Sequence, residues 1–301
     1  MSLKSEISSL VGFYGPMLGK ELHEHLPDVE LLKLWQACFT SNDLQLSQFS
    51  RYYLRYDIMR DDYIRLSPSI LRDFLSFTLF SQDSQRDAIL ERLIRLSNRH
   101  REISRWKTHL ARNVLADVFA ELAIEDAQHV CAFIAGDLAY FLGHNEPREI
   151  EALGEMVRGS DLDIIIIHDG LTGEKVEQIN QRMLMAKNYM IRNPNLRQEL
   201  DFIVKSQDRM FGQFAYETIQ QKIASKIAYE SMFMAGSIRL YTEVMEELRR
   251  SGTQDRIDAD FEKGLSDRAA ATTQLLRTDP ESLDKNTRSL FYFSQERIEF
   301  E

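Results

Sequence analysis

The sequence of 301 residues contains only two cysteines and no long apolar run, and each scarcity excludes a class of protein. Cys38 and Cys131 are too few for a disulfide framework and lack the spacing of a structural zinc site. The longest strictly apolar run, residues 130–135, is far shorter than the ~20 residues that cross a bilayer. The first residues lack the basic start and apolar stretch of a secretory signal. We therefore expect a cytoplasmic protein without a membrane partner.

Proline and glycine are also scarce, with 6 and 13 residues, and no internal repeat or low-complexity tract occurs. The chain has 44% hydrophobic and 28% charged residues, which is close to the average of globular proteins. This composition argues against a collagen-like, coiled-coil or disordered chain. Its length is typical of about two domains.

Basic residues are outnumbered by acidic ones, 37 to 47, so the formal net charge is −10. The first 105 residues hold 14 of each sign, and the whole acidic excess therefore lies after them. Tight non-specific binding to nucleic acid depends on neutralising phosphates with Lys and Arg, so nucleic acid is not a favoured partner. Acidic residues that gather in one cleft would suit a divalent metal.

Apolar residues recur at intervals of three and four through the first hundred residues, a pattern that predicts helices. Three helices are expected before a small hairpin at residues 58–66, and the third covers residues 44–56 with an N-cap at residues 41–43. This order resembles a winged helix, so we predict a winged-helix-like module over residues 1–70. Such a module can contact nucleic acid, dock a protein or pack within the chain.

The helical pattern continues through a connector, residues 71–126, and changes at residue 129. Helical spacing returns in a C-terminal region, residues 206–301, and in a segment near residues 174–191. Three short β-prone runs lie in between, at residues 130–135, 162–167 and 200–204. We therefore predict an α+β protein whose core, residues 127–205, is a small mixed sheet flanked by helical regions.

Three aspartates lie where β-prone runs begin. Asp161 and Asp163 alternate with Leu162, so on a strand both point to one face, with Cα atoms about 6.6 Å apart. Asp201 begins a later run, and pairing of the two strands would bring a third carboxylate beside the first two. Carboxylates suit Mg²⁺ or Mn²⁺, and two ions ~3.5–4 Å apart can activate a hydroxyl and stabilise a leaving pyrophosphate. Asp161, Asp163 and Asp201 are therefore candidate metal ligands and catalytic residues.

The surroundings of these acids resemble the DNA polymerase beta-like nucleotidyltransferases. That family has a strand ending in a glycine turn, a short helix, a strand with Asp-x-Asp, and a third acid on a later strand. Gly136, the sequence Asp161-Leu162-Asp163 and Asp201 take those places. The sequences Gly154-Glu155 and Ser160-Asp161-Leu162-Asp163 are similar to the bacterial protein-uridylyltransferase and adenylyltransferase branch. The resemblance covers about residues 129–205.

The resemblance implies an enzyme that moves a nucleoside monophosphate from an NTP to a hydroxyl of a protein or small molecule and releases pyrophosphate. Asp161 and Asp163 would hold Mg²⁺ or Mn²⁺, and Asp201 would complete the site and help deprotonate the acceptor. The glycine turn would lie against the nucleotide phosphates, as helix N-termini favour anions. The candidate nucleotide-binding residues are Gly136, Asp137, Glu155 and Ser160.

Two departures from the family pattern keep other hypotheses open. Asp137 stands where the family usually has Ser or Gly, and residues 144–152 are interpreted as an insertion that lengthens the loop over the site. A second hypothesis is therefore a regulatory or scaffolding protein whose nucleotidyltransferase-like domain binds nucleotide or a partner without turnover. A third makes residues 1–70 a DNA-binding regulator, which needs a basic surface that the composition does not favour.

Overall fold

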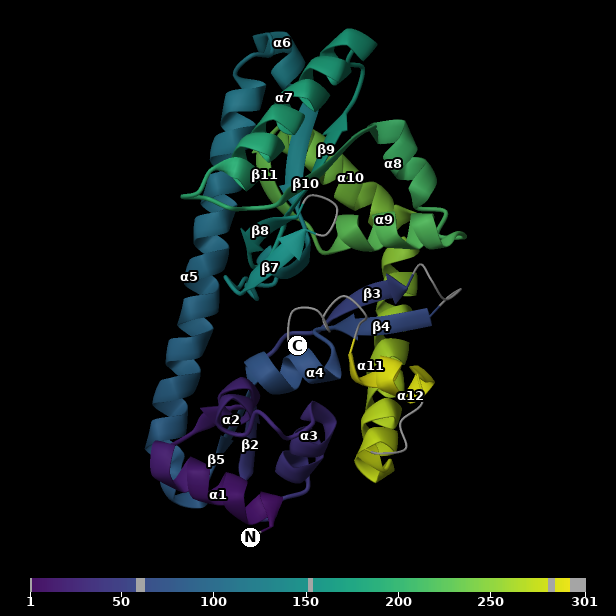
Figure 1. The fold of residues 1–301 in the computed structure, drawn as a ribbon. Coiled ribbons are helices and arrows are strands. Elements are labelled where there is room, and N and C mark those ends of the chain that lie inside the picture. Colours follow the sequence, from purple (N-terminus) through teal and green to yellow (C-terminus); the bar gives the residue numbers. More distant parts are fainter. Residues whose placement is uncertain (1, 58–62, 151–153, 281–284, 293–301) are drawn as a thin grey trace. The chain divides into compact units, whose positions relative to one another are not determined.

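The computed structural model describes residues 2–57, 63–150, 154–280 and 285–292 (Figure 1). Helices account for 59% and strands for 18% of the structure, with several small sheets, which confirms the predicted α+β class. Among the described residues, no helix has both the length and the apolar character needed to cross a membrane. The chain forms two compact units. The first draws on residues 1–55, 64–99 and 261–301, and the second on residues 56–63 and 100–260.

The first unit begins with three helices and a three-stranded antiparallel sheet in the order β1-β5-β2. Its core contains the aromatic side chains of Trp35, Phe74 and Phe80. The helices are α1 (Leu3–Tyr14), α2 (Gly19–His25) and α3 (Leu31–Phe39). The strands are β1 (Met17–Leu18), β2 (Gln45–Gln48) and β5 (Thr78–Ser81). Between β2 and β5 lie the strand pair β3 (Tyr53–Asp57) and β4 (Tyr63–Ser67), the short helix α4 (Ile70–Arg72) and a π-helical turn, Asp73–Phe77.

The helix predicted over residues 44–56 is wrong, because β2 and β3 occupy this segment. Its apolar spacing fits a helix, but Leu46 pairs with Phe80 across the ladder to β5, and Tyr53 and Leu54 are buried in an extended strand. Aromatic residues favour strands when a partner strand is present, so tertiary pairing decides this segment. The tip of the predicted hairpin, residues 58–62, lies outside the described residues.

The second unit is built around the predicted mixed sheet, which has four strands in the order β10-β9-β6-β11. Strands β9 and β10 are parallel, and β6 is antiparallel to both β9 and β11. The strands are β6 (Val130–Ile134), β9 (Leu162–His168), β10 (Leu200–Ser206) and β11 (Met232–Gly236). The three runs predicted from the sequence therefore form three of its strands. Strand β11 was not predicted, because it interrupts a C-terminal region whose spacing is otherwise helical.

Helices cover both faces of this sheet, and the alternating side chains of β6 and β9 divide between two cores. On one face, Ile164 and Ile166 pack with Leu115 of α5 (Arg86–Phe119) and Met183 of α7 (Gly173–Arg192). On the other face lie α8 (Gln207–Gln213), α9 (Ile219–Tyr229) and α10 (Ile238–Arg250). Burial on both faces explains why β9 contains the unbroken isoleucine run Ile164 to Ile167.

The remaining elements are short, apart from one long C-terminal helix. They are α6 (Ile124–Ala127), a 3₁₀ turn at Gly136–Leu138, β7 (Pro147–Ile150), β8 (Glu155–Arg158), α11 (Thr253–Arg277) and α12 (Lys285–Phe291). A 3₁₀ turn at Asp83–Gln85 precedes α5. Two segments differ from the sequence prediction. The helical connector of residues 71–126 contains β5, and the inserted segment contains β7, which pairs with β8 as a hairpin rather than forming a plain loop.

Candidate metal site at the β9 and β10 strands

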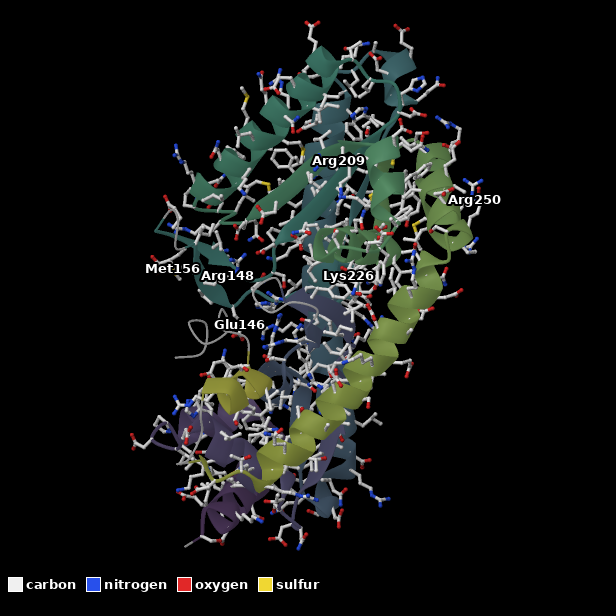
Figure 2. All side chains as sticks on the ribbon, turned by 90° about the vertical axis from the view of Figure 1, so that its right-hand side faces the viewer. Glu146, Arg148, Met156, Arg209, Lys226 and Arg250 are labelled. Atoms are coloured by element: carbon white, nitrogen blue, oxygen red, sulfur yellow. The ribbon has the colours of Figure 1, made fainter. Side chains whose placement is uncertain are left out.

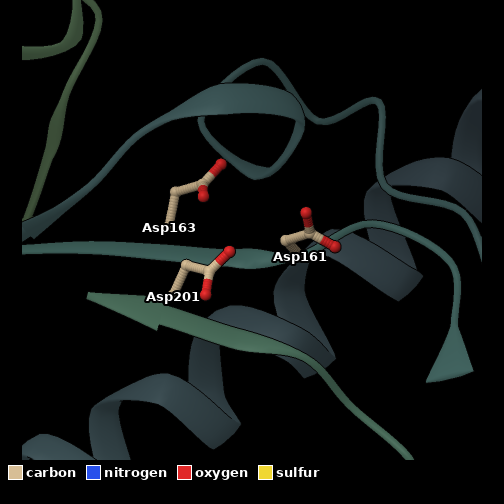
Figure 3. A group of neighbouring side chains, drawn as sticks. All are labelled: Asp161, Asp163 and Asp201. Atoms are coloured by element: carbon tan, nitrogen blue, oxygen red, sulfur yellow. The ribbon is translucent and has the colours of Figure 1, made fainter. Parts of the chain in front are cut away.

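Parallel pairing of β9 and β10 brings the three predicted aspartates together. Asp163 lies directly opposite Asp201 in the ladder, and Asp161 immediately precedes β9. One carboxylate oxygen from each of the three lies within 4.8 Å of the other two (Figure 3). Because divalent cations of the Mg²⁺ class take oxygen ligands from several carboxylates at once, this arrangement can hold such an ion.

Gly136 lies against the triad. It follows β6 with φ +69°, a left-handed conformation that favours glycine, and a Cβ at this position would lie 2.8 Å from Oδ2 of Asp163. Its N–H donates to Oε1 of Glu230 at 3.2 Å, and the N–H of Ala135 donates to the carbonyl oxygen of Asp163 at 3.1 Å. The glycine turn is therefore packed directly on a candidate metal ligand.

Substitution of Gly136 by alanine tests this close approach. Gly170 is a matched control, because its φ is +75° and a Cβ there would meet nothing within 4 Å. Both substitutions strain the backbone, but only Gly136→Ala also pushes on Asp163. We expect Gly136→Ala to lower the free energy of unfolding by ~1–2 kcal/mol more than Gly170→Ala, as measured by urea denaturation. Equal losses for the two variants would contradict the packing described here.

Asp163 is the most enclosed of the three acids. Burial, with the neighbouring Asp201 carboxylate as the next cause, raises the pKa of Asp163 to about 6, and the ammonium of Lys226 opposes the rise. At neutral pH this carboxyl is mostly ionised, although burial and the Asp201 charge make ionisation unfavourable. A bound cation would stabilise the ionised form. Asp201 is more open, since 48% of its side chain is exposed.

The raised pKa of Asp163 makes stability depend on pH. The folded chain holds this proton more tightly than the unfolded chain, so the free energy of unfolding falls as pH rises from about 4 to about 6. We expect Asp163→Asn, measured by urea denaturation with a chelator, to raise the free energy of unfolding by ~2 kcal/mol at pH 8 and to change little at pH 4. Asp208→Asn, at an exposed position, is the control. A destabilised Asp163→Asn at pH 8 would contradict this account.

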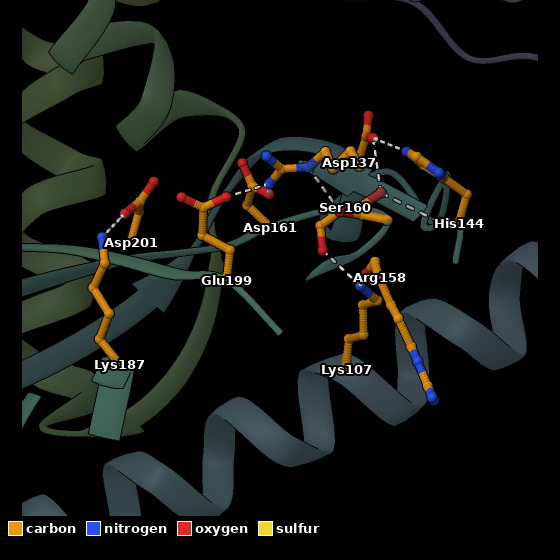
Figure 4. A network of polar contacts seen from close by, with 11 residues as sticks. Lys107, Asp137, His144, Arg158, Ser160, Asp161, Lys187, Glu199 and Asp201 are labelled. Atoms are coloured by element: carbon orange, nitrogen blue, oxygen red, sulfur yellow. Dashed lines mark hydrogen bonds and ion pairs between the residues drawn. The ribbon is translucent and has the colours of Figure 1, made fainter. Parts of the chain in front are cut away.

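Two cations contact the other two aspartates, and Figure 4 shows the pair formed by Lys187 and Asp201. Arg148, on β7, forms an ion pair with Asp161, and its Nη2 also lies 2.5 Å from Oε2 of Glu199. Lys187, on α7, places Nζ 2.5 Å from Oδ1 of Asp201. The chain therefore supplies its own positive charge to the acidic cluster.

Lys107 fixes the backbone just before Asp161. Its side chain is fully buried in α5, and Nζ donates to the carbonyl oxygens of Arg158 and Ser160, each at 2.6 Å. Burial, followed by the nearby guanidinium of Arg148, lowers the pKa of Lys107 to about 7, against the opposing effect of Asp137. The turn that leads into β9 is thus held by α5.

The remaining predicted residues lie outside the group of converging acids. Asp137 accepts a hydrogen bond from Oγ of Ser160 at 3.0 Å, and Nε2 of His144 lies 3.9 Å from the same oxygen. The hydroxyl of Ser160 in turn accepts from the His144 N–H at 3.2 Å. Glu155 lies on β8 opposite Ile150. Asp137 and Ser160 therefore join the glycine turn to the start of β9.

Several residues that support the site could not be predicted from the sequence. Arg148 lies in the segment interpreted as an insertion, and Lys107 lies on a polar helix where a lysine usually faces solvent. Glu230 accepts from Gly136 and forms an ion pair with Lys226 at 2.7 Å, and burial raises the pKa of this glutamate. No spacing in the sequence links Arg148, Lys107 or Glu230 to the three aspartates. Folding brings Arg148 and Lys107 to the start of β9 and Glu230 to the glycine turn.

The comparisons with known proteins do not extend this description. No protein-family model, curated protein or solved structure matches this chain. The candidate site has three features: three carboxylates that converge at adjacent parallel strands, a glycine turn packed on one of them, and two cations paired with the others.

Proposed function

We propose that the chain is a metal-dependent nucleotidyltransferase that transfers a nucleoside monophosphate from an NTP to a hydroxyl of a protein or small molecule. One observation carries the proposal: carboxylate oxygens of Asp161, Asp163 and Asp201 lie within 4.8 Å of one another beside a glycine turn. The donor set consists only of oxygens, which matches Mg²⁺ or Mn²⁺. Pyrophosphate is the product released with the transferred group.

The three aspartates differ in burial, and this difference suggests their roles. Asp163 is enclosed and its charge is costly without a cation, so it suits a permanent ligand. Asp161 precedes the strand and would be a second ligand. Asp201 is half exposed, so it can reach an incoming hydroxyl and take its proton. A bound divalent ion would supply Lewis-acid activation and charge stabilisation.

The glycine turn is the proposed contact for the nucleotide phosphates. The Gly136 N–H is already paired with Glu230, so phosphate binding there would require this hydrogen bond to be shared or exchanged. Asp137 contacts Ser160 and His144, which orders the turn. We therefore propose that Asp137 and Ser160 shape the loop that would bind the nucleotide. Glu155, on β8, stays a nucleotide-binding candidate on the sequence resemblance alone.

A second candidate function is a regulatory protein that binds nucleotide or a partner without turnover. The ion pairs of Arg148 with Asp161 and of Lys187 with Asp201 favour it, because internal cations already neutralise two of the acids. We place it second, since such pairs can also exchange for a metal ion.

For residues 1–70 we propose a winged-helix-like module that recruits or senses a partner. Helices α1, α2 and α3 followed by the strand pair β3 and β4 support this outline. Its third helix is α3 (Leu31–Phe39), rather than residues 44–56. The balanced charge of the first 105 residues favours a protein partner over nucleic acid.

The test of the proposed activity is pyrophosphate release from each of the four NTPs with Mg²⁺ or Mn²⁺. A parallel titration measures binding of the same nucleotides, and candidate acceptors are supplied as a cell extract depleted of small molecules and as a hydroxyl-bearing metabolite mixture. Release that requires the metal and one NTP supports the enzyme. Binding without release under all acceptor conditions supports the regulatory function.

A further inference from the structure

Arg148 bridges three groups around the acidic triad. Its guanidinium pairs with Asp161 and Glu199, and its Nε donates to the carbonyl oxygen of Gly159 at 3.2 Å. Its side chain is 20% exposed, and that of Glu199 is 12% exposed. Figure 2 shows Arg148, on β7, near Met156, on the paired strand β8, and only β7 lies within the predicted insertion of residues 144–152. The hairpin thus delivers a cation to one edge of the site.

We propose that Arg148 is a resident counter-ion of the metal site, which a divalent ion must displace from Asp161 before the site fills. The inference rests on the proposed function, because it concerns the same carboxylates. Arg148 on β7 would then set the affinity of the site for its metal.

Charge and geometry both support displacement. The Asp161 carboxylate takes part in both interactions. It pairs with the Arg148 guanidinium, and one of its oxygens converges with those of Asp163 and Asp201. A guanidinium and a divalent cation on one carboxylate repel each other at a few ångströms, where screening is weak. Metal and arginine therefore compete for Asp161.

The surrounding contacts allow the arginine to leave without moving the aspartate. Lys107 holds the carbonyl oxygens of Arg158 and Ser160, so two carbonyl groups just before Asp161 keep their donor when the Arg148 guanidinium shifts. Glu199 remains as an acceptor for the displaced guanidinium. The exchange thus needs only a side-chain shift from two carboxylates to one.

The experiment compares Mn²⁺ binding to the full chain, by calorimetry and by the Mn²⁺-induced rise in melting temperature. Arg148→Gln removes the counter-ion, and Arg101→Gln, at an exposed position on α5, removes the same charge elsewhere. We expect Arg148→Gln to bind Mn²⁺ about tenfold tighter than the wild type. Its melting temperature should be lower without metal and should rise more on Mn²⁺ addition, while Arg101→Gln should behave as the wild type.

Equal or weaker Mn²⁺ binding by a folded Arg148→Gln chain overturns the inference. If Arg148→Gln does not fold, Arg148→Lys replaces it. Lysine keeps the charge but cannot bridge both carboxylates and the Gly159 carbonyl. We therefore expect Arg148→Lys to bind Mn²⁺ more tightly than the wild type, and an unchanged affinity for Mn²⁺ would contradict the inference.

Failure of the proposed function gives a different pattern. If Arg148→Gln binds Mn²⁺ more tightly but the wild type releases no pyrophosphate, the counter-ion inference stands and the proposed enzymatic function fails. If the wild type releases pyrophosphate with metal but Arg148→Gln has unchanged affinity for Mn²⁺, the enzymatic function stands and the counter-ion inference fails.

Discussion

The Asp161→Ala/Asp163→Ala chain is expected to lose metal-dependent pyrophosphate release by at least ~10³-fold, because two of three converging carboxylates are removed. The measurement is the rate of release with Mg²⁺ and with Mn²⁺ at saturating NTP. This is the largest effect that the proposed function implies. Retention of more than a tenth of the wild-type rate would contradict the metal-ligand role of the pair.

The same double variant also separates a metal site from a structural ion-pair cluster. Without metal, removal of Asp163 relieves its repulsion with Asp201, and Arg148 retains Glu199 as a partner. We therefore expect the melting temperature of the metal-free double variant to equal or exceed that of the wild type. The control replaces two exposed acids of the same unit, Asp208 and Glu217, by alanine and should leave the rate unchanged. A clear fall in the melting temperature would indicate a structural role for Asp161 and Asp163.

Lys107→Met is expected to have the second largest effect. The carbonyl oxygens of Arg158 and Ser160, the second of them buried, lose their donor, which costs ~2 kcal/mol of unfolding free energy in total, after relief of the ammonium's own desolvation. The turn before Asp161 is then no longer held, so we also expect weaker Mn²⁺ binding. Arg105→Met, at an exposed position on the same helix, is the matched control and should change neither quantity.

The pH dependence of Lys107→Met gives an independent check. Because burial lowers the pKa of Lys107 to about 7, the unfolded chain binds this proton more tightly than the folded chain. The wild type therefore gains unfolding free energy as pH rises from about 7 towards 10, and the variant lacks this gain. The deficit of Lys107→Met should grow from pH 7 to pH 9. A deficit independent of pH would show that the lysine is not titrating where the structure places it.

The core strands could be predicted because burial on both faces leaves a clear mark in the sequence. Ile164 to Ile167 has no polar residue, and the prediction of three β-prone runs is confirmed by β6, β9 and β10. The helix near residues 174–191 is likewise confirmed by α7 (Gly173–Arg192). Strand β11 was beyond prediction, since Met232 to Ala235 is short and becomes a strand by pairing with β6. The failed helix over residues 44–56 has the same cause.

The three aspartates could be predicted because strand alternation and adjacent pairing are local rules. Alternation predicts that Asp161 and Asp163 point to one side, the parallel ladder places Asp201 opposite Asp163, and the three carboxylates converge. Arg148 and Lys107 could not, because their contacts depend on how a hairpin and a distant helix pack against the start of β9. Charged residues in the sequence do not reveal which of them the fold buries.

Anomalous scattering of Mn²⁺ tests most directly whether the three carboxylates hold a divalent ion. The measurement is an anomalous difference map from crystals grown with Mn²⁺ and a non-hydrolysable NTP analogue. We expect a peak among the carboxylate oxygens of Asp161, Asp163 and Asp201, with the triphosphate completing the coordination and Arg148 withdrawn to Glu199. Bound nucleotide without a peak at these oxygens, with Asp161 still paired with Arg148 and Asp201 with Lys187, would contradict the proposed metal site.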